Sequence, residues 1–312
     1  MNFLPGTWGD NLYGWWADFF WPAMELLATA PLIATRGNHE NCARAGHGYF
    51  LFLYYDDYPS DVRAGDWCDE YTPPFTVPFQ HEQFLVMDDS AISPKGGGID
   101  HFDFIDGACP NAPLENDGVI LALPQSRYDD PKQTASDVME QINQYKEYFD
   151  QLEAAAMNFD TNFYVSHHPL FAIACNASHM VTLDWTMQMA LSPMTLDRVS
   201  AMIGGHMHWF GAFSFENQTL PAQVVVGNGG TMLIDNYVNQ DALPFVRLEV
   251  GQGGMYQGTV ESGITSSNFG FGIMQRHAND SYTTDFYNVS GVDIETPELL
   301  DFQLDIPKGP RV

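Results

Sequence analysis

The stretch "VSAMIGGHMHWFG", residues 199–211, joins an apolar run to two glycines and two histidines. Val199 to Ile203 has the length and composition of a short buried strand. In extended backbone, residues two apart point to the same side, so we expect His206 and His208 to face one site while Met207 faces away. Two consecutive glycines weaken a strand, and they indicate that the backbone here closely approaches something bound.

A second apolar run ends in histidines in "NFYVSHHPLF", residues 162–171. The run from Asn162 to Ser166 is typical of a strand, and it breaks at His167 and His168, just before a proline. In open α/β sheets, ligands bind beyond the carboxyl ends of the strands. The position of these histidines therefore favours a binding site over a packing role.

A third run ends in polar residues in "PLIATRGNHENC", residues 31–42. Leu32 to Thr35 is predicted to be a short buried strand, and the loop that follows carries Asn38 and His39. Imidazole nitrogen and amide oxygen are good ligands for Zn, Fe, Mn or Co. One histidine alone is more often structural than a ligand, but three such strand ends in this order predict a metal site. The other histidines have no such context and are interpreted as structural or surface residues: His47, His81, His101, His179 and His277.

The remaining pattern predicts an α/β or α+β fold with layered sheets and covering helices. Further strands are predicted at Phe84 to Met87 and Gln223 to Val226, and helical spacing of apolar residues predicts a helix over Val138 to Leu152. The stretch "WWADFFWPAMELLATAPLIA", residues 15–34, is predicted to form a core-facing helix and then a strand. It is interrupted by acidic residues and prolines, which fits neither a membrane span nor a signal peptide.

The charge of the chain restricts its partners. Forty acidic residues against twelve Lys and Arg give a formal net charge of −28 at pH 7. Such a surface repels nucleic acid, so we expect no nucleic-acid surface and a small substrate instead. Phosphate chemistry on this chain needs its own local positive charge, and metal ions would supply it.

The cysteines and sequons bear on the compartment. Cys42, Cys68, Cys109 and Cys175 form no C-x-x-C pair, so they fit either one or two disulfides or four buried thiols. Four N-x-S/T sequons, beginning at Asn176, Asn217, Asn279 and Asn288, would be acceptors in a eukaryotic secretory setting. With the acidity and the few lysines, these features lean towards a secreted or periplasmic protein.

The three motifs together resemble those of the calcineurin-like metallophosphoesterase superfamily, which includes the purple acid phosphatases. The shared features are G-N-H-E, then H-x-P at His167, then G-H-x-H at residues 205–208, with "VVVGNGG" at residues 224–230 as the following strand and glycine turn. The likeness covers residues 30 to about 235. It implies one domain over residues 1–312 with a four-layer α/β/β/α sandwich, in which residues 251–312 supply C-terminal edge strands.

The resemblance also implies a function, the hydrolysis of phosphate mono- or diesters by a metal-bound hydroxide at a site with two ions of Fe, Mn or Zn. By position, Asn38, His167 and His206 would bind one metal and His208 the other. His39 would be the acid that protonates the leaving group or orients the phosphate.

One part of the family pattern is not found before Asn38. The family places a D-x-H motif and a G-D motif on its first two strands, and here only Gly9-Asp10 offers a loose match. We therefore expect a chain that is N-terminally incomplete and lacks its first strands. The alternative to an enzyme is a catalytically impaired remnant or binding module of the same fold. Substrate selectivity is expected in the excursions at residues 54–80 and 95–130.

Overall fold

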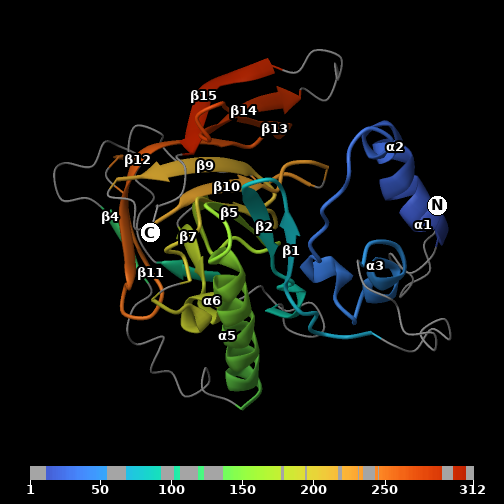
Figure 1. The fold of residues 1–312 in the computed structure, drawn as a ribbon, viewed down its shortest axis with the longest axis horizontal. Helices are drawn as coiled ribbons and strands as arrows, with labels where there is room; N and C mark the ends of the chain where they lie inside the picture. Colours follow the sequence, from blue (N-terminus) through green and yellow to red (C-terminus); the bar gives the residue numbers. More distant parts are fainter. Residues whose placement is uncertain are drawn as a thin grey trace. The chain divides into compact units, whose positions relative to one another are not determined.

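The computed structural model describes residues 12–54, 68–92, 102–105, 119–122, 136–176, 179–193, 195–216, 220–230, 232–234, 243–244, 246–289 and 298–306. The chain divides into two compact units (Figure 1). Unit 1 comprises Met1–Pro73 and Asp88–Asp100, and unit 2 comprises Pro74–Met87 and His101–Val312.

Unit 2 is built on a nine-stranded mixed sheet. Its central strands β2, β5, β8 and β10 are mutually parallel, with Val86 opposite Val165 and Val165 opposite Ile203. Their carboxyl ends therefore lie along one edge of the sheet. In spatial order the strands are β1 (Phe75–Pro78), β2 (Glu82–Val86), β5 (Thr161–Val165), β8 (Ala201–Gly204), β10 (Ala222–Val226), β9 (Phe210–Phe215), β12 (Tyr256–Ser266), β11 (Val246–Val250) and β4 (Val119–Ala122).

A smaller antiparallel sheet packs on one face of this large sheet (Figure 1). It consists of β13 (Phe269–Arg276), β14 (Tyr282–Val289) and β15 (Glu298–Ile306). Phe163 of β5 meets Tyr282 of β14 edge to face, with ring centroids 4.9 Å apart. A third sheet contains β3 (Phe102–Ile105), β7 (His179–Asp184) and β6 (Phe171–Asn176).

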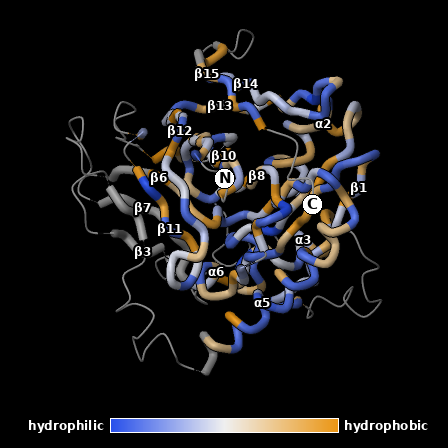
Figure 2. The backbone as a smooth tube through the Cα atoms, turned by 60° about the vertical axis from the view of Figure 1, so that its left-hand side comes forward, coloured by the Kyte–Doolittle hydropathy of each residue, from blue (hydrophilic) through white to orange (hydrophobic). Residues whose placement is uncertain are grey.

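Helices cover the opposite face of the large sheet (Figure 1). Helix α5 (Ser136–Ala156) stacks Phe149 on Tyr164 of β5, and α6 (Trp185–Ala190) follows β7. Hydrophilic and hydrophobic residues mix along α5 (Figure 2), as expected for a helix with one buried side. The predicted helix is confirmed, and so is the mixed α/β fold class.

Unit 1 contains short helices: α1 (Leu12–Trp15), the π-helix η1 (Trp16–Phe20), α2 (Trp21–Leu27), the 3-10 turn η2 (Asn38–Glu40), α3 (Gly46–Phe52) and the 3-10 turn η4 (Ser90–Ile92). The prediction of a helix near the N-terminus is confirmed, but its core-facing character is wrong. Trp15 is buried, whereas Trp21 and Leu26 are 60% and 65% exposed. Apolar residues occur on every side of this helical segment, so burying one side leaves the others in solvent.

The predicted strand at Leu32 to Thr35 is also wrong. These residues form no regular secondary structure, and Leu32 is 47% exposed. A strand needs a neighbour to satisfy its backbone groups, and none of the strands in the described part of the chain pairs with this run.

Arg36 anchors the segment that leads into Asn38. Its guanidinium is fully buried and lies 3.2 Å from the Asp88 carboxylate. It donates hydrogen bonds to Ser90 Oγ at 2.6 Å and to the carbonyl oxygens of Asp69 at 2.7 Å and Glu70 at 2.6 Å. A planar guanidinium with several donors is suited to such a buried network.

A disulfide joins Cys42 and Cys68 in unit 1, so the alternative of four buried thiols is wrong. The side chains of Cys109 and Cys175 lie outside the described residues. Among the described residues, no helix combines the length and apolar character that crossing a membrane requires.

Replacing Asp88 by Asn should destabilise the protein by about 3 kcal/mol, because it leaves the buried Arg36 charge uncompensated. Asp280→Asn is the matched control, since Asp280 pairs with Arg276 at a half-exposed surface, where a pair contributes about 1 kcal/mol or less. Denaturant unfolding of the two variants measures both effects. Equal losses of unfolding free energy would contradict the anchoring role of Arg36.

Candidate metal centre

The candidate centre lies where β5 and β8 end. Pairing between the two parallel strands continues past their last residues, because Ser166 N–H donates to Ile203 O at 3.1 Å and Gly205 N–H donates to His167 O at 2.9 Å. These bonds hold the two histidine-bearing turns side by side at the carboxyl edge of the sheet. Their backbone is fixed by the ladder itself.

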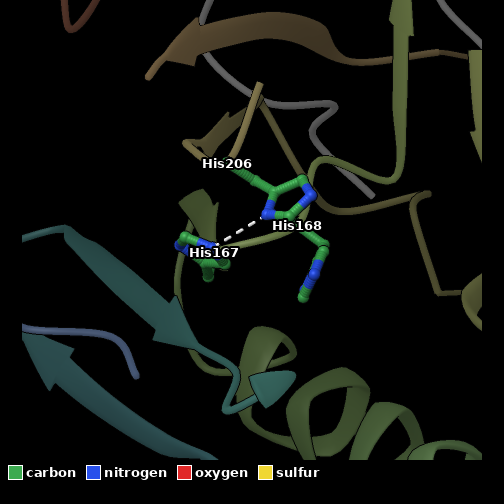
Figure 3. A group of neighbouring side chains, drawn as sticks. All are labelled: His167, His168 and His206. Atoms are coloured by element: carbon green, nitrogen blue, oxygen red, sulfur yellow. Dashed lines mark hydrogen bonds between the residues drawn. The ribbon is translucent and has the colours of Figure 1, made fainter. Parts of the chain in front are cut away.

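Three histidines come together at this edge (Figure 3). Nε2 of His167 and Nδ1 of His206 are 3.0 Å apart and share a hydrogen bond. The ligating nitrogens of His167, His168 and His206 all lie within 4.8 Å of one another. Among the described histidines, cysteines and carboxylates, these three histidines form the group whose ligand atoms lie close enough together to hold a metal ion. It contains no carboxylate.

The backbone around His206 differs from the extended geometry that was predicted. Residues 205–209 are not part of a strand, and His206 and His208 have φ values of 62° and 40°. The alternation of side chains in a strand therefore does not apply to residues 206–208. His206 belongs to the histidine group, His208 is not a member of it, and a site that both side chains face stays a prediction. A left-handed conformation is costly for a residue other than glycine, and such strain persists mainly at functional sites.

The two glycines before His206 have different roles. A Cβ on Gly204 would lie 3.1 Å from Cα and Cβ of Pro169, so β8 approaches the backbone after His168 closely. A Cβ on Gly205 would meet atoms of His167 only at 3.8 Å, an ordinary contact. The close approach predicted from these glycines is real at Gly204, but its partner is the neighbouring chain segment.

His208 is held by the glycine turn after β10. A Cβ on Gly227 would lie 2.7 Å from the His208 backbone nitrogen, and Ile234 N–H donates to His208 O at 3.0 Å. The next residue, Asn228, is buried and donates from Nδ2 to Asn268 O at 2.8 Å. Strand β10 and its turn thus form as expected, and they hold the backbone of His208.

His168 was not among the predicted ligands. The resemblance to metallophosphoesterases favours His167, because the ligand of that family lies two residues before the proline. The structure bends at residues 167–168, and the two rings lie 5.0 Å apart between centroids. His168 is fully buried, and its ring centroid lies 4.3 Å from that of His206. The adjacent His-His-Pro sequence is the one signal that could have indicated it.

Asn38 and His39 belong to unit 1, on the turn η2. Asn38 is buried and His39 is exposed, and the His39 carbonyl accepts a hydrogen bond from Ala45 N–H at 3.1 Å. Burial raises the pKa of the Glu40 carboxyl, against the opposing effects of a backbone hydrogen bond at Gly37 and of the Arg44 and Arg36 charges. Asp10 lies outside the described residues.

A purple acid phosphatase isolated from yellow lupin (Lupinus luteus) seeds aligns with a TM-score of 0.54 and 11% identity, over 96% of this chain and 44% of that chain. The chain has the fold of a purple acid phosphatase. It spans less than half the length of that protein.

A structure of PhoD aligns with a TM-score of 0.38 and 11% identity, over 81% of this chain and 44% of that chain. We draw no conclusion from this weaker likeness. No protein-family model and no curated protein matches the sequence. The likeness to the purple acid phosphatase is therefore one of fold.

The packing of Gly204 gives a prediction. Gly204→Ala should cost about 1–3 kcal/mol of unfolding free energy, because its methyl group is forced against Pro169. Gly205→Ala is the matched control and should be tolerated, since its methyl group has room. Denaturant unfolding of both variants measures the difference. A tolerated Gly204→Ala would contradict the close approach of β8 to the His167–Pro169 turn.

Proposed function

We propose that this protein is a metal-dependent phosphoesterase. One observation carries the proposal: two histidine nitrogens, His167 Nε2 and His206 Nδ1, lie 3.0 Å apart at the carboxyl edge of a sheet with the purple acid phosphatase fold. A shared proton holds such a pair together, and a metal ion can take the place of that proton.

The residues present fit a metal ion. Zinc bonds to histidine nitrogen at about 2.0–2.1 Å, so two nitrogens of a tetrahedral site lie about 3.3 Å apart, close to the observed 3.0 Å. When bound, a divalent or trivalent ion would supply Lewis-acid activation of water and charge neutralisation at the phosphate. His167 and His206 would hold it, and His208 stays a predicted ligand to a second ion.

Hydrogen bonds hold the turn that carries His167, which favours binding without reorganisation. Ser166 Oγ donates to the His168 carbonyl at 2.7 Å inside the bend, and Gln188 Nε2 donates to the Leu170 carbonyl at 2.6 Å just after it. These bonds keep the imidazole of His167 at the sheet edge.

Asn38 and His39 keep their predicted roles in the proposal. Asn38 would supply a neutral oxygen ligand. His39, whose side chain is exposed, would hold the proton that the leaving group takes up. A small phosphorylated substrate is favoured, because a net charge of −28 opposes large polyanions.

A second candidate function is a binding module that holds metal without turnover. The absence of a carboxylate from the described histidine group favours it, because carboxylates offset the repulsion between two closely spaced cations. Hydrolysis assays on the metal-loaded chain distinguish the two functions.

The proposal predicts hydrolysis of generic phosphomonoesters or phosphodiesters by the full chain after loading with Zn²⁺, Mn²⁺ or Fe ions. His206→Ala should lower kcat/KM by at least about 100-fold, since losing even an outer partner of a ligand typically costs 10–100-fold. His277→Ala is the control, because His277 bonds Thr283 Oγ1 at 2.8 Å and is not a member of the histidine group. Undiminished turnover in His206→Ala, or no turnover in the loaded wild type, would refute the proposed activity.

His39→Ala should lower kcat about 10²- to 10⁴-fold, the usual contribution of a positioned general acid. The loss should shrink for esters with a good leaving group such as nitrophenol, which departs without protonation. The measurement compares the loss of kcat for an alkyl phosphate with the loss of kcat for a nitrophenyl phosphate, with the wild type and the variant at equal metal content. A loss of the same size for both esters would argue against the acid role.

A further inference from the structure

We propose that His168 is a third metal ligand, so that His167, His168 and His206 form a single three-histidine site contained within unit 2. This inference rests on the metal-binding part of the proposed function and does not depend on hydrolysis. The resemblance to metallophosphoesterases points to His167 only, so His168 is an addition to the ligand set that the resemblance implies.

The bend after β5 is the first observation. Successive side chains of a strand point to opposite faces, yet His167 and His168 have ring centroids 5.0 Å apart with planes 85° from parallel. The bend at residues 167–168 brings both rings to one side, and the Ser166 Oγ to His168 O hydrogen bond stabilises it.

The position of His206 is the second observation. Its left-handed backbone, with φ of 62°, turns its ring towards both neighbours, with centroids 5.0 Å from His167 and 4.3 Å from His168. Two unusual backbone conformations, on segments 39 residues apart, thus direct three imidazoles to one place (Figure 3).

Distances and chemistry agree with a metal. All three ligating nitrogens lie within 4.8 Å of one another. This distance exceeds the spacing of about 3.3 Å in a tetrahedral zinc site by about 1.5 Å at most. Rotation of the rings can close that gap. Three neutral histidines with an open fourth position are a known ligand set of catalytic zinc. His168, the third member of this set, is fully buried.

The test is zinc titration of the full, chelator-stripped chain, by calorimetry and by the visible spectrum of the Co²⁺ form. We expect one ion per three-histidine site, with affinity lowered at least about tenfold in His167→Gln, His168→Gln and His206→Gln. His277→Gln is the control and should bind as the wild type does. Because His168 is buried, His168→Phe is measured too, and thermal unfolding in chelator checks that each variant folds.

X-ray absorption spectroscopy of the zinc-loaded wild type tests the inference without any variant. A spectrum that is fitted with three imidazole ligands to zinc supports the inference. Wild-type affinity in both His168 variants, with affinity lost in His167→Gln or His206→Gln, would overturn it and leave the proposed function standing. A wild type that binds no zinc would overturn this inference, and one that binds none of Zn²⁺, Mn²⁺ and Fe ions would overturn the proposed function as well. Zinc binding that depends on His168 without any hydrolysis supports this inference and refutes the activity.

Discussion

Two hydrogen bonds beyond the last residues of β5 and β8 control the position of the whole histidine group. Ser166 N–H to Ile203 O and Gly205 N–H to His167 O extend the parallel ladder into the two turns. Since the ladder also fixes the register of Val165 opposite Ile203, the two backbone segments that carry the rings have little freedom to separate. The close approach of Gly204 to Pro169 has the same effect. The 3.0 Å distance between His167 Nε2 and His206 Nδ1 is therefore a consequence of sheet register. A buried polar network is not needed to explain it.

Much of unit 2 follows from local patterns in the sequence. Apolar runs at Phe84, Phe163 and Val224 form the parallel centre of the sheet, and the helical spacing around Tyr145 forms α5. These predictions hold because each element buries a face that its own periodicity defines. Leu32 to Thr35 is mainly apolar, as those runs are, but no strand in the described chain pairs with it. Composition alone carries no information about a partner.

The site could be predicted in part. His167 and His206 are found where strands end, which the sequence indicates. The differences between the predicted and the observed site arise from backbone conformation. A bend brings His168 into the histidine group, and left-handed φ values at His206 and His208 replace the extended backbone expected of a strand. Hydrophobic periodicity does not report such conformations. The buried Arg36 and Asp88 pair, which joins residues 52 positions apart, was likewise out of reach of local reasoning.

Anomalous diffraction from zinc-soaked crystals, recorded on both sides of the zinc absorption edge, tests the central claim most directly. The account predicts a peak about 2.1 Å from both His167 Nε2 and His206 Nδ1, with the two ladder hydrogen bonds intact. Zinc bound elsewhere in the crystal with no peak between these nitrogens would contradict it.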